Sequence, residues 1–172
     1  VALTGSHNPS NYNGMKIMLG GQTLSGEAIQ GLRKRAEARD FISGEGHSRN
    51  QNIIPEYLDR IVEDVTLHRP LRILIDCGNG VAGGVAPPLF TMLGCDVESL
   101  FCEVNGNFPH HHPDPSVPEN LDAMISLVRL QNADLGLAFD GDGDRLGIVD
   151  SEGRIIWPDR QMMMFATDVL SR

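Results

Sequence analysis

The stretch GLAFDGDGDRLGIVD, residues 136–150, places an apolar run on each side of a cluster of aspartates. The runs DLGLAF (134–139) and RLGIVD (145–150) have the length and composition of buried strands. Between them, glycine alone separates the three carboxylates of Asp140, Asp142 and Asp144. The sequence therefore predicts a strand, a short acidic loop and a second strand.

Three carboxylates this close together repel one another, and this cost must be offset in the folded protein. Two like charges about 6 Å apart repel by roughly 3 kcal/mol at an effective dielectric constant near 20. Gly141 and Gly143 favour a tight backbone over side chains splayed into water. A divalent cation would remove the repulsion, and aspartate oxygens are hard ligands suited to Mg²⁺ or Ca²⁺. The loop predicts a metal site, with a solvated acidic turn as the alternative.

An EF-hand is a poor match to this loop. Counted from Asp140, its sixth and twelfth positions hold Arg145 and Ser151, where an EF-hand needs Gly and Glu. The flanking runs also predict strands, whereas an EF-hand loop lies between helices.

The pattern around this stretch predicts the fold class. LRILIDC (71–77) and DVESLFCEV (96–104) predict two further strands, and helical segments are expected near 85–93 and 118–130. Strands that alternate with helices indicate a parallel layer, and RLGIVD and RIIW, joined by SEG, predict a hairpin that closes it. We expect an α/β fold of mixed, mainly parallel sheets with helices on both faces.

Other local signals predict helices and a linker. Residues 25–39 favour a helix with Ser25 as its N-cap, and residues 55–68 favour a second helix. The polar segment 43–52 between them predicts a linker or loop.

Two predictions concern single residues in helices. Ser116 and Glu119 have the spacing of a capping box ahead of the helix at 118–130. Met162, Met163 and Met164 lie in a presumed C-terminal helix, where methionine usually fills a core.

The segment GNGVAGG has two interpretations. Gly78, Gly80 and Gly83 follow a predicted strand with the G-x-G-x-x-G spacing of dinucleotide-binding proteins. Pro87 and Pro88, however, interrupt the helix that would carry a pyrophosphate. Close packing between strand and helix is the favoured interpretation, and a nicotinamide-cofactor domain is the alternative.

Composition limits the class of protein. The chain of 172 residues has a formal net charge of −9, which disfavours nucleic acid or an anionic membrane as a partner. Its sequence contains no apolar run long enough to span a bilayer. The three cysteines, Cys77, Cys95 and Cys102, are odd in number and lack C-x-x-C spacing. Buried free thiols in a reducing cytoplasm are expected, and the histidines at 110–112 predict a loop of packed and exposed imidazoles.

The first 18 residues, VALTGSHNPSNYNGMKIM, contain a possible nucleophile loop. Gly5 frees the backbone before the hydroxyl of Ser6, His7 could act as a base, and Lys16 supplies a cation. The alternative is an ordinary turn, because Ser, Asn, Pro and Gly are common in turns.

Five motifs together resemble the α-D-phosphohexomutase family, and its phosphomannomutase/phosphoglucomutase branch most of all. They are TGSHNP, NGMK, DCGNGVAG, NGNFPHHHPDPSVPENL and DGDGDR, which occur in the family's order over essentially the whole chain. The resemblance implies a mutase that moves phosphate between C1 and C6 of mannose or glucose phosphate, through a phosphoserine and a 1,6-bisphosphate intermediate. It implies hexose monophosphates as substrates and a glucose or mannose 1,6-bisphosphate as activator.

The resemblance also assigns roles to residues. Ser6 is expected to be the phosphoserine, and Asp140, Asp142 and Asp144 to hold Mg²⁺ together with an oxygen borne by Ser6. Arg145 is then well placed to contact the phosphoryl group with its fork of donors. Lys16 resembles the family's lysine near the phosphoserine, a candidate for proton transfer or for stabilising the phosphate, and His7 is expected to orient the phosphate or the hydroxyl.

The family has four domains, and the chain is expected to be an excerpt. Residues 1–52 resemble the end of domain 1, residues 53–154 the whole of domain 2 and residues 155–172 the start of domain 3. We expect the excerpt to be inactive by itself, and the full-length protein to be a cytoplasmic monomer.

Two alternatives to this assignment remain open. A phosphoglucosamine mutase is one, although such enzymes tend to carry Ala-Ser-His-Asn where this chain has Gly5-Ser6-His7-Asn8. The other is a non-catalytic α/β module that binds a divalent metal.

Overall fold

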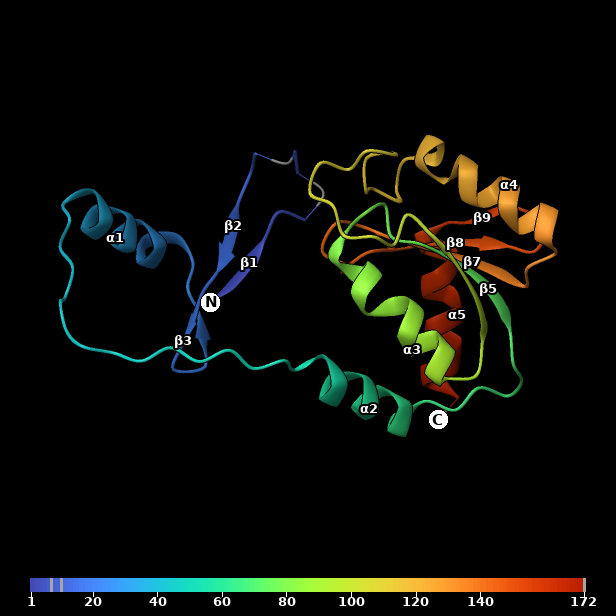
Figure 1. Cartoon of the computed structure of the whole chain (residues 1–172), viewed down its shortest axis with the longest axis horizontal. Helices are drawn as coiled ribbons and strands as arrows, with labels where there is room; N and C mark the ends of the chain where they lie inside the picture. Colours follow the sequence, from blue (N-terminus) through green and yellow to red (C-terminus); the bar gives the residue numbers. More distant parts are fainter. Residues whose placement is uncertain (7, 10, 172) are drawn as a thin grey trace. The chain divides into compact units, whose positions relative to one another are not determined.

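A computed structural model describes residues 1–6, 8–9 and 11–171 of the chain (Figure 1). These residues form two compact units. The smaller contains Val1–Thr4 and Asn13–Ile53, and the larger contains Gly5–Tyr12 and Ile54–Arg172. The segment around Ser6 therefore belongs to the same unit as the aspartate loop, although it is distant in sequence. Within the described residues, no helix has the length and apolar character needed to cross a membrane.

The smaller unit consists of two antiparallel strand pairs and a helix: β1 (Ala2–Thr4) with β2 (Gly14–Lys16), β3 (Met18–Leu19) with β4 (Gln22–Thr23), and α1 (Gly26–Glu37). The predicted helix is confirmed, and Ser25 occupies its N-cap position. Within the described part of the chain, the Ser25 side chain forms no capping hydrogen bond. Residues 43–52 are irregular, as predicted.

The larger unit is built on one five-stranded sheet. Its elements in chain order are α2 (Ile54–Asp64), β5 (Arg72–Asp76), the 3₁₀ turn η1 (Val81–Gly84), α3 (Ala86–Met92), β6 (Asp96–Leu100), the 3₁₀ turn η2 (Pro118–Leu121), α4 (Asp122–Gln131), β7 (Leu135–Phe139), β8 (Leu146–Asp150), β9 (Ile155–Ile156) and α5 (Pro158–Leu170). The strand order in the sheet is β6-β5-β7-β8-β9.

The strand directions confirm the predicted fold class. β5 is parallel to β6 and to β7, whereas β8 is antiparallel to its neighbours β7 and β9. β9 therefore runs in the same direction as β5, β6 and β7, so β8 alone is reversed in this sheet. The predicted hairpin is the β8–β9 pair.

One strand is shorter than predicted. β6 ends at Leu100 instead of continuing to residue 104. Phe101 has a φ of 50°, which lies outside the extended region and turns the chain away from the sheet.

Helices cover both faces of the sheet, with α3 and α4 on opposite sides (Figure 1). Alternate residues of β5 face opposite layers, as the two-residue period of a strand requires. Ile73 and Ile75 pack in one core with Ala86 of α3, whereas Leu74 packs in the other with Met124 and Val128 of α4. The result is an α/β/α arrangement with two separate cores.

The predicted capping box at Ser116 is wrong. The hydroxyl of Ser116 donates to Asp114 Oδ1 at 2.6 Å instead of capping a helix. The turn η2 follows it, and α4 begins only at Asp122, so Ser116 lies too far from the first turn of α4 to cap it.

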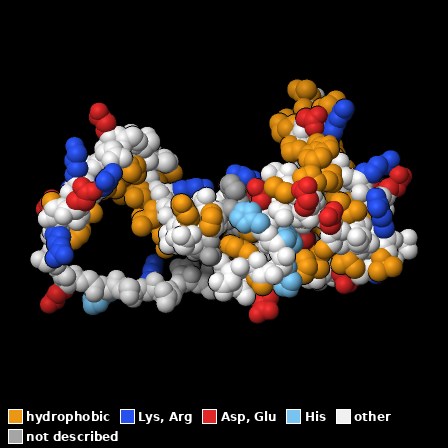
Figure 2. Space-filling model, turned by 90° about the horizontal axis from the view of Figure 1, so that it is seen from above, with side chains coloured by type: hydrophobic (Ala, Val, Ile, Leu, Met, Phe, Trp, Pro, Cys, Tyr) orange, Lys and Arg blue, Asp and Glu red, His pale blue; other side chains and the backbone are white. Residues whose placement is uncertain are grey.

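The methionines of the C-terminal helix are not core residues. Met162, Met163 and Met164 lie in α5 as predicted, but their exposed fractions are 63%, 60% and 58%. The buried residue of α5 is Gln161, whose amide donates to the Ile156 carbonyl at 2.7 Å. Gln161, and not the methionines, is therefore the residue that α5 buries. The surface carries further apolar side chains, visible in orange in Figure 2.

Gly136 in β7 should be essential for the close approach of α4 to the sheet. A Cβ atom at this position would lie 2.9 Å from Val128 Cγ2 and 3.0 Å from Met124 Sδ. We expect Gly136→Ala to lower the free energy of unfolding by about 1–3 kcal/mol through overpacking, measured by urea denaturation. Gly84→Ala is the matched control, because nothing lies within 4 Å of a Cβ there. Equal effects of the two substitutions would contradict this view of the interface.

Candidate functional site

The acidic loop between β7 and β8 is closed by its own backbone. Gly143 N donates to the Asp140 carbonyl at 3.1 Å, and Arg145 N donates to Asp140 Oδ1 at 3.1 Å. The ligand atoms of Asp140, Asp142 and Asp144 all lie within 4.8 Å of one another. The structure thus brings the three predicted carboxylates together in one tight loop.

Asp140 is the buried member of this group. Its exposed fraction is 0%, and burial raises the pKa of its carboxyl group. The neighbouring charges of Asp142 and Asp144 raise the pKa further, whereas the hydrogen bond from the Arg145 amide opposes this effect. Because a cation would relieve both the burial of charge and the mutual repulsion, this oxygen donor set fits Mg²⁺.

Ser6 meets the loop across 134 residues of sequence. Its hydroxyl donates to Asp140 Oδ2 at 3.3 Å. The Ser6 carbonyl also lies so close to Gly141 that a Cβ there would overlap it. Ser6 has a φ of 49°, an unusual value for a residue other than glycine and one typical of functional loops. The predicted nucleophile and the predicted metal ligands therefore lie in one site.

Arg145 lies at the edge of the same site. Its Nε atom is 4.0 Å from Asp140 Oδ2, and its side chain is 47% exposed. The guanidinium is held beside the buried carboxylate and still reaches solvent, where it could contact an anionic ligand.

Lys16 and His7 are the two remaining predicted site residues. Lys16 ends β2, opposite Ala2 of β1, and belongs to the smaller unit. His7 lies outside the described residues.

The glycines of GNGVAGG allow close packing of the backbone next to the acidic loop. A Cβ on Gly80 would lie 2.8 Å from the Gly141 carbonyl oxygen, and Val81 N donates to that oxygen at 3.1 Å. A Cβ on Gly83 would overlap the Cys102 carbonyl. α3 begins only at Ala86, beyond these glycines. The contacts favour close backbone packing over a pyrophosphate site at a helix N-terminus.

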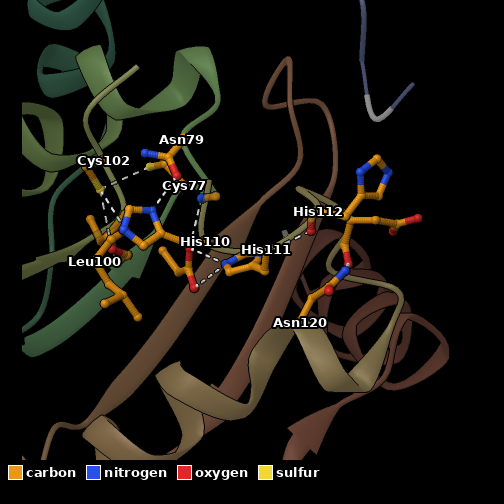
Figure 3. A network of polar contacts seen from close by, with 12 residues as sticks. Cys77, Asn79, Leu100, Cys102, His110, His111, His112 and Asn120 are labelled. Atoms are coloured by element: carbon orange, nitrogen blue, oxygen red, sulfur yellow. Dashed lines mark hydrogen bonds and ion pairs between the residues drawn. The ribbon is translucent and has the colours of Figure 1, made fainter. Parts of the chain in front are cut away.

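The histidine segment lies against the same loops, which its sequence did not indicate. His111 Nε2 is 3.1 Å from Oδ2 of Asp76, a carboxylate with an exposed fraction of 1%. His110 Nδ1 is 2.8 Å from Asn79 Oδ1 (Figure 3). Pro113 packs on Gly78, at 3.0 Å from the position of a Cβ. The imidazoles are packed in a loop as expected, and their contacts fix the residues that follow β5.

A largely apolar pocket of about 400 Å³ opens beside the loop. Tyr57 and Phe90 contribute to its wall, and it reaches Asp142 and Gly143. The surroundings of the acidic loop therefore include this apolar pocket as well as the polar contacts of the histidine segment.

Comparison with known proteins relates this chain to phosphoglucomutases and phosphomannomutases. A family model described as phosphoglucomutase/phosphomannomutase, alpha/beta/alpha domain II, matches residues 55–153. A phosphomannomutase/phosphoglucomutase of Pseudomonas aeruginosa is 56% identical over 172 residues, covering 100% of this chain and 37% of the relative. A phosphoglucomutase of Neisseria gonorrhoeae is 55% identical over 174 residues, covering 100% of this chain and 38% of the relative.

A solved structure and a more distant relative complete the comparison. The crystal structure of a phosphoglucomutase/phosphomannomutase family protein from Burkholderia thailandensis matches with a TM-score of 0.92 at 51% identity, covering 99% of this chain and 37% of that chain. A probable phosphoglucosamine mutase of Methanothermobacter thermautotrophicus is 34% identical, covering 98% of this chain and 38% of the relative. The chain thus spans well under half the length of the proteins it matches.

The contact between His111 and Asp76 should make stability depend on pH. The hydrogen bond to Asp76 raises the pKa of His111 above 6.5 in the folded state, although burial opposes this. The stabilisation is therefore complete below the unfolded-state pKa and is lost as the pH rises through the folded-state pKa. We expect His111→Asn to cost about 3 kcal/mol near pH 6, because it leaves a buried carboxylate without its cation, and less at alkaline pH.

The measurement is urea denaturation of both proteins across this pH range. The same substitution at the exposed His68 is the control and should change little at any pH. A cost for His111→Asn that is constant with pH would contradict a charged pair.

Proposed function

The chain belongs to the phosphoglucomutase/phosphomannomutase family, and on this premise we propose that it carries the phosphoserine loop and the metal loop of a phosphosugar mutase. The reaction moves phosphate between C1 and C6 of mannose or glucose phosphate. The observation that carries the proposal is the 3.3 Å hydrogen bond from Ser6 Oγ to Asp140 Oδ2. It supports a shared role for a nucleophile and a carboxylate cluster that lie far apart in sequence.

Ser6 is the proposed phosphoryl carrier. In its phosphorylated form it donates the phosphoryl group to a hydroxyl of a sugar monophosphate, which produces a 1,6-bisphosphate and free Ser6. The bisphosphate then reorients in the site and returns its other phosphate to Ser6. The net result is a moved phosphate and a regenerated phosphoserine, and a 1,6-bisphosphate added from outside would prime the enzyme.

The aspartates are the proposed Mg²⁺ ligands. A phosphate on Ser6 would stand beside the buried carboxylate of Asp140, so a cation is needed to offset the repulsion. Asp140, Asp142 and Asp144 would hold it together with an oxygen of the phosphoserine. Bound Mg²⁺ would withdraw negative charge from the phosphoryl group during transfer.

Three further residues complete the proposed site. Arg145 would contact the phosphoryl group with its guanidinium, and its position 4.0 Å from Asp140 supports this role. Lys16 and His7 are proposed from the family resemblance, as a stabilising cation and as an orienting group.

The full-length protein is proposed to have four domains. Residues 1–52 would end domain 1, residues 53–154 would form domain 2, and residues 155–172 would begin domain 3. The match of the family model to 55–153 and the 37% coverage of the relatives support this division. β9 continues the sheet two residues past the proposed end of domain 2. We propose that the chain by itself is inactive, and that the whole protein is a cytoplasmic monomer.

Two alternatives differ in what they predict. Phosphoglucosamine as substrate is less favoured, because the relative with that name is 34% identical whereas those named for glucose or mannose reach 55% and 56%. A non-catalytic metal module would bind Mg²⁺ and carry no exchangeable phosphate on Ser6.

The phosphoserine can be tested by mass spectrometry of the full-length protein. After incubation with glucose 1,6-bisphosphate and Mg²⁺, we expect one phosphate on the peptide that contains Ser6, and its loss when a hexose monophosphate is added. Ser6→Ala should lower mutase activity by roughly 10³-fold or more, because the carrier is removed. Ser25→Ala is the control and should be neutral. A protein that never carries phosphate at Ser6 would favour the metal module.

The metal site can be tested separately by calorimetry with Mg²⁺ alone. Asp142→Asn removes one charged ligand and should weaken Mg²⁺ binding by roughly tenfold or more. Asp159→Asn, which changes an exposed carboxylate of α5, makes the same change in net charge and should leave the affinity unaltered. If both variants bind as the unmodified protein does, the acidic loop is a solvated turn and not a metal site.

A further inference from the structure

Two free cysteines lie in contact at the edge of the sheet where the acidic site is built. Cys77 follows β5 and Cys102 follows β6, and the two strands are parallel neighbours with Asp76 opposite Leu100. The Sγ atoms are 3.3 Å apart (Figure 3). Cys77 is buried and Cys102 is half-buried, and Cys102 Sγ also lies 3.3 Å from the Leu100 carbonyl and 3.5 Å from the Ile75 carbonyl.

We propose that Cys77 and Cys102 form a reversible disulfide by exchange with a low-molecular-weight disulfide such as glutathione disulfide, and that its closure weakens the cation site of the acidic loop. The first part stands on the position of the two thiols. The second part rests on the function proposed for the aspartates.

The geometry and the chemistry of the pair agree. The side chains already lie side by side, so that a bond requires the sulfur atoms to approach by only roughly 1 Å. The hydrogen bond between them stabilises a single thiolate, which lowers the pKa of Cys102 and raises that of Cys77. Cys102 is also the less buried of the two residues, and it is the proposed attacking group.

The exchange is balanced in two steps. The Cys102 thiolate attacks one sulfur of the small disulfide, forms a mixed disulfide and releases one small thiolate. Cys77 then attacks the Cys102 sulfur and gives its proton to the departing group, which forms the Cys77–Cys102 bond and releases the second small molecule as a thiol. Two protein thiols are oxidised while one small disulfide is reduced to two thiols, and an excess of a small dithiol reverses both steps.

Backbone contacts connect this pair to the acidic loop. Gly83 packs directly on the Cys102 carbonyl, and a Cβ on Gly80 would lie 3.0 Å from the Asp140 carbonyl oxygen. Val81 N donates to the Gly141 carbonyl at 3.1 Å. A movement of Cys77 toward Cys102 therefore displaces the segment on which Asp140 and Gly141 rest, and little free space is left to absorb it.

The disulfide itself is tested by peptide mapping of the full-length protein without reduction, after glutathione disulfide and then an alkylating agent. We expect a linked pair of peptides containing Cys77 and Cys102, and Cys95 as a separate alkylated residue. The link should persist in Cys95→Ser and be absent from Cys102→Ser. Glutathione on Cys102 without a link, or two separately alkylated thiols, would overturn the proposal.

The effect on the site is tested by calorimetry with Mg²⁺ on the reduced and the oxidised protein. We expect oxidation to weaken Mg²⁺ binding by roughly tenfold, the scale on which outer-sphere support acts, and dithiothreitol to restore it. Cys102→Ser should bind Mg²⁺ equally well before and after treatment. A disulfide that forms and leaves the affinity unchanged would overturn the coupling, whereas a reduced protein without any Mg²⁺ binding would instead contradict the function proposed above.

Discussion

The burial of the Asp140 carboxylate is the constraint on which the site depends. A charged group without exposure is costly unless hydrogen bonds and opposite charge compensate it. Here the Arg145 amide and the Ser6 hydroxyl donate to its two oxygens, at 3.1 Å and 3.3 Å. One carboxylate thereby fixes the shape of its own loop and the position of the Ser6 hydroxyl.

The loops around Asp140 meet because parallel strands end at the same edge of the sheet. β5, β6 and β7 run in one direction, so the segments that follow them converge, and such edges are where α/β proteins bind ligands. The glycines allow this convergence at the distances observed. Gly80 approaches the carbonyls of the acidic loop, and Gly141 approaches the carbonyl of Ser6, in both cases closer than any side chain would permit.

Close packing of the loops also brings together several polar and thiol side chains that have no proposed role in the reaction. Asp76 is buried at the end of β5 and needs His111, just as Asn79 is held by His110. Cys77 and Cys102, which follow the parallel neighbours β5 and β6, are likewise in contact. Titratable and oxidisable side chains thus hold the loops of the site in place. Changes in pH or redox state should therefore affect the site through residues that are not themselves part of it.

The sequence by itself determined the α/β class, the hairpin that closes the sheet and the acidic loop, because these depend on local periodicity and on glycine spacing. It could not determine the end of β6 or the exposure of Met162–Met164, since each depends on how the segment packs with other parts of the chain. It also missed the hydrogen bond from Ser116 to Asp114, which spans only two residues, because the same hydroxyl matched the spacing of a capping box. Only the tertiary structure decided that Ser6 meets Asp140 and that the histidine segment holds Asp76. Contacts of this kind arise where chain ends converge on a sheet edge, and no local pattern of residues records which loops will converge.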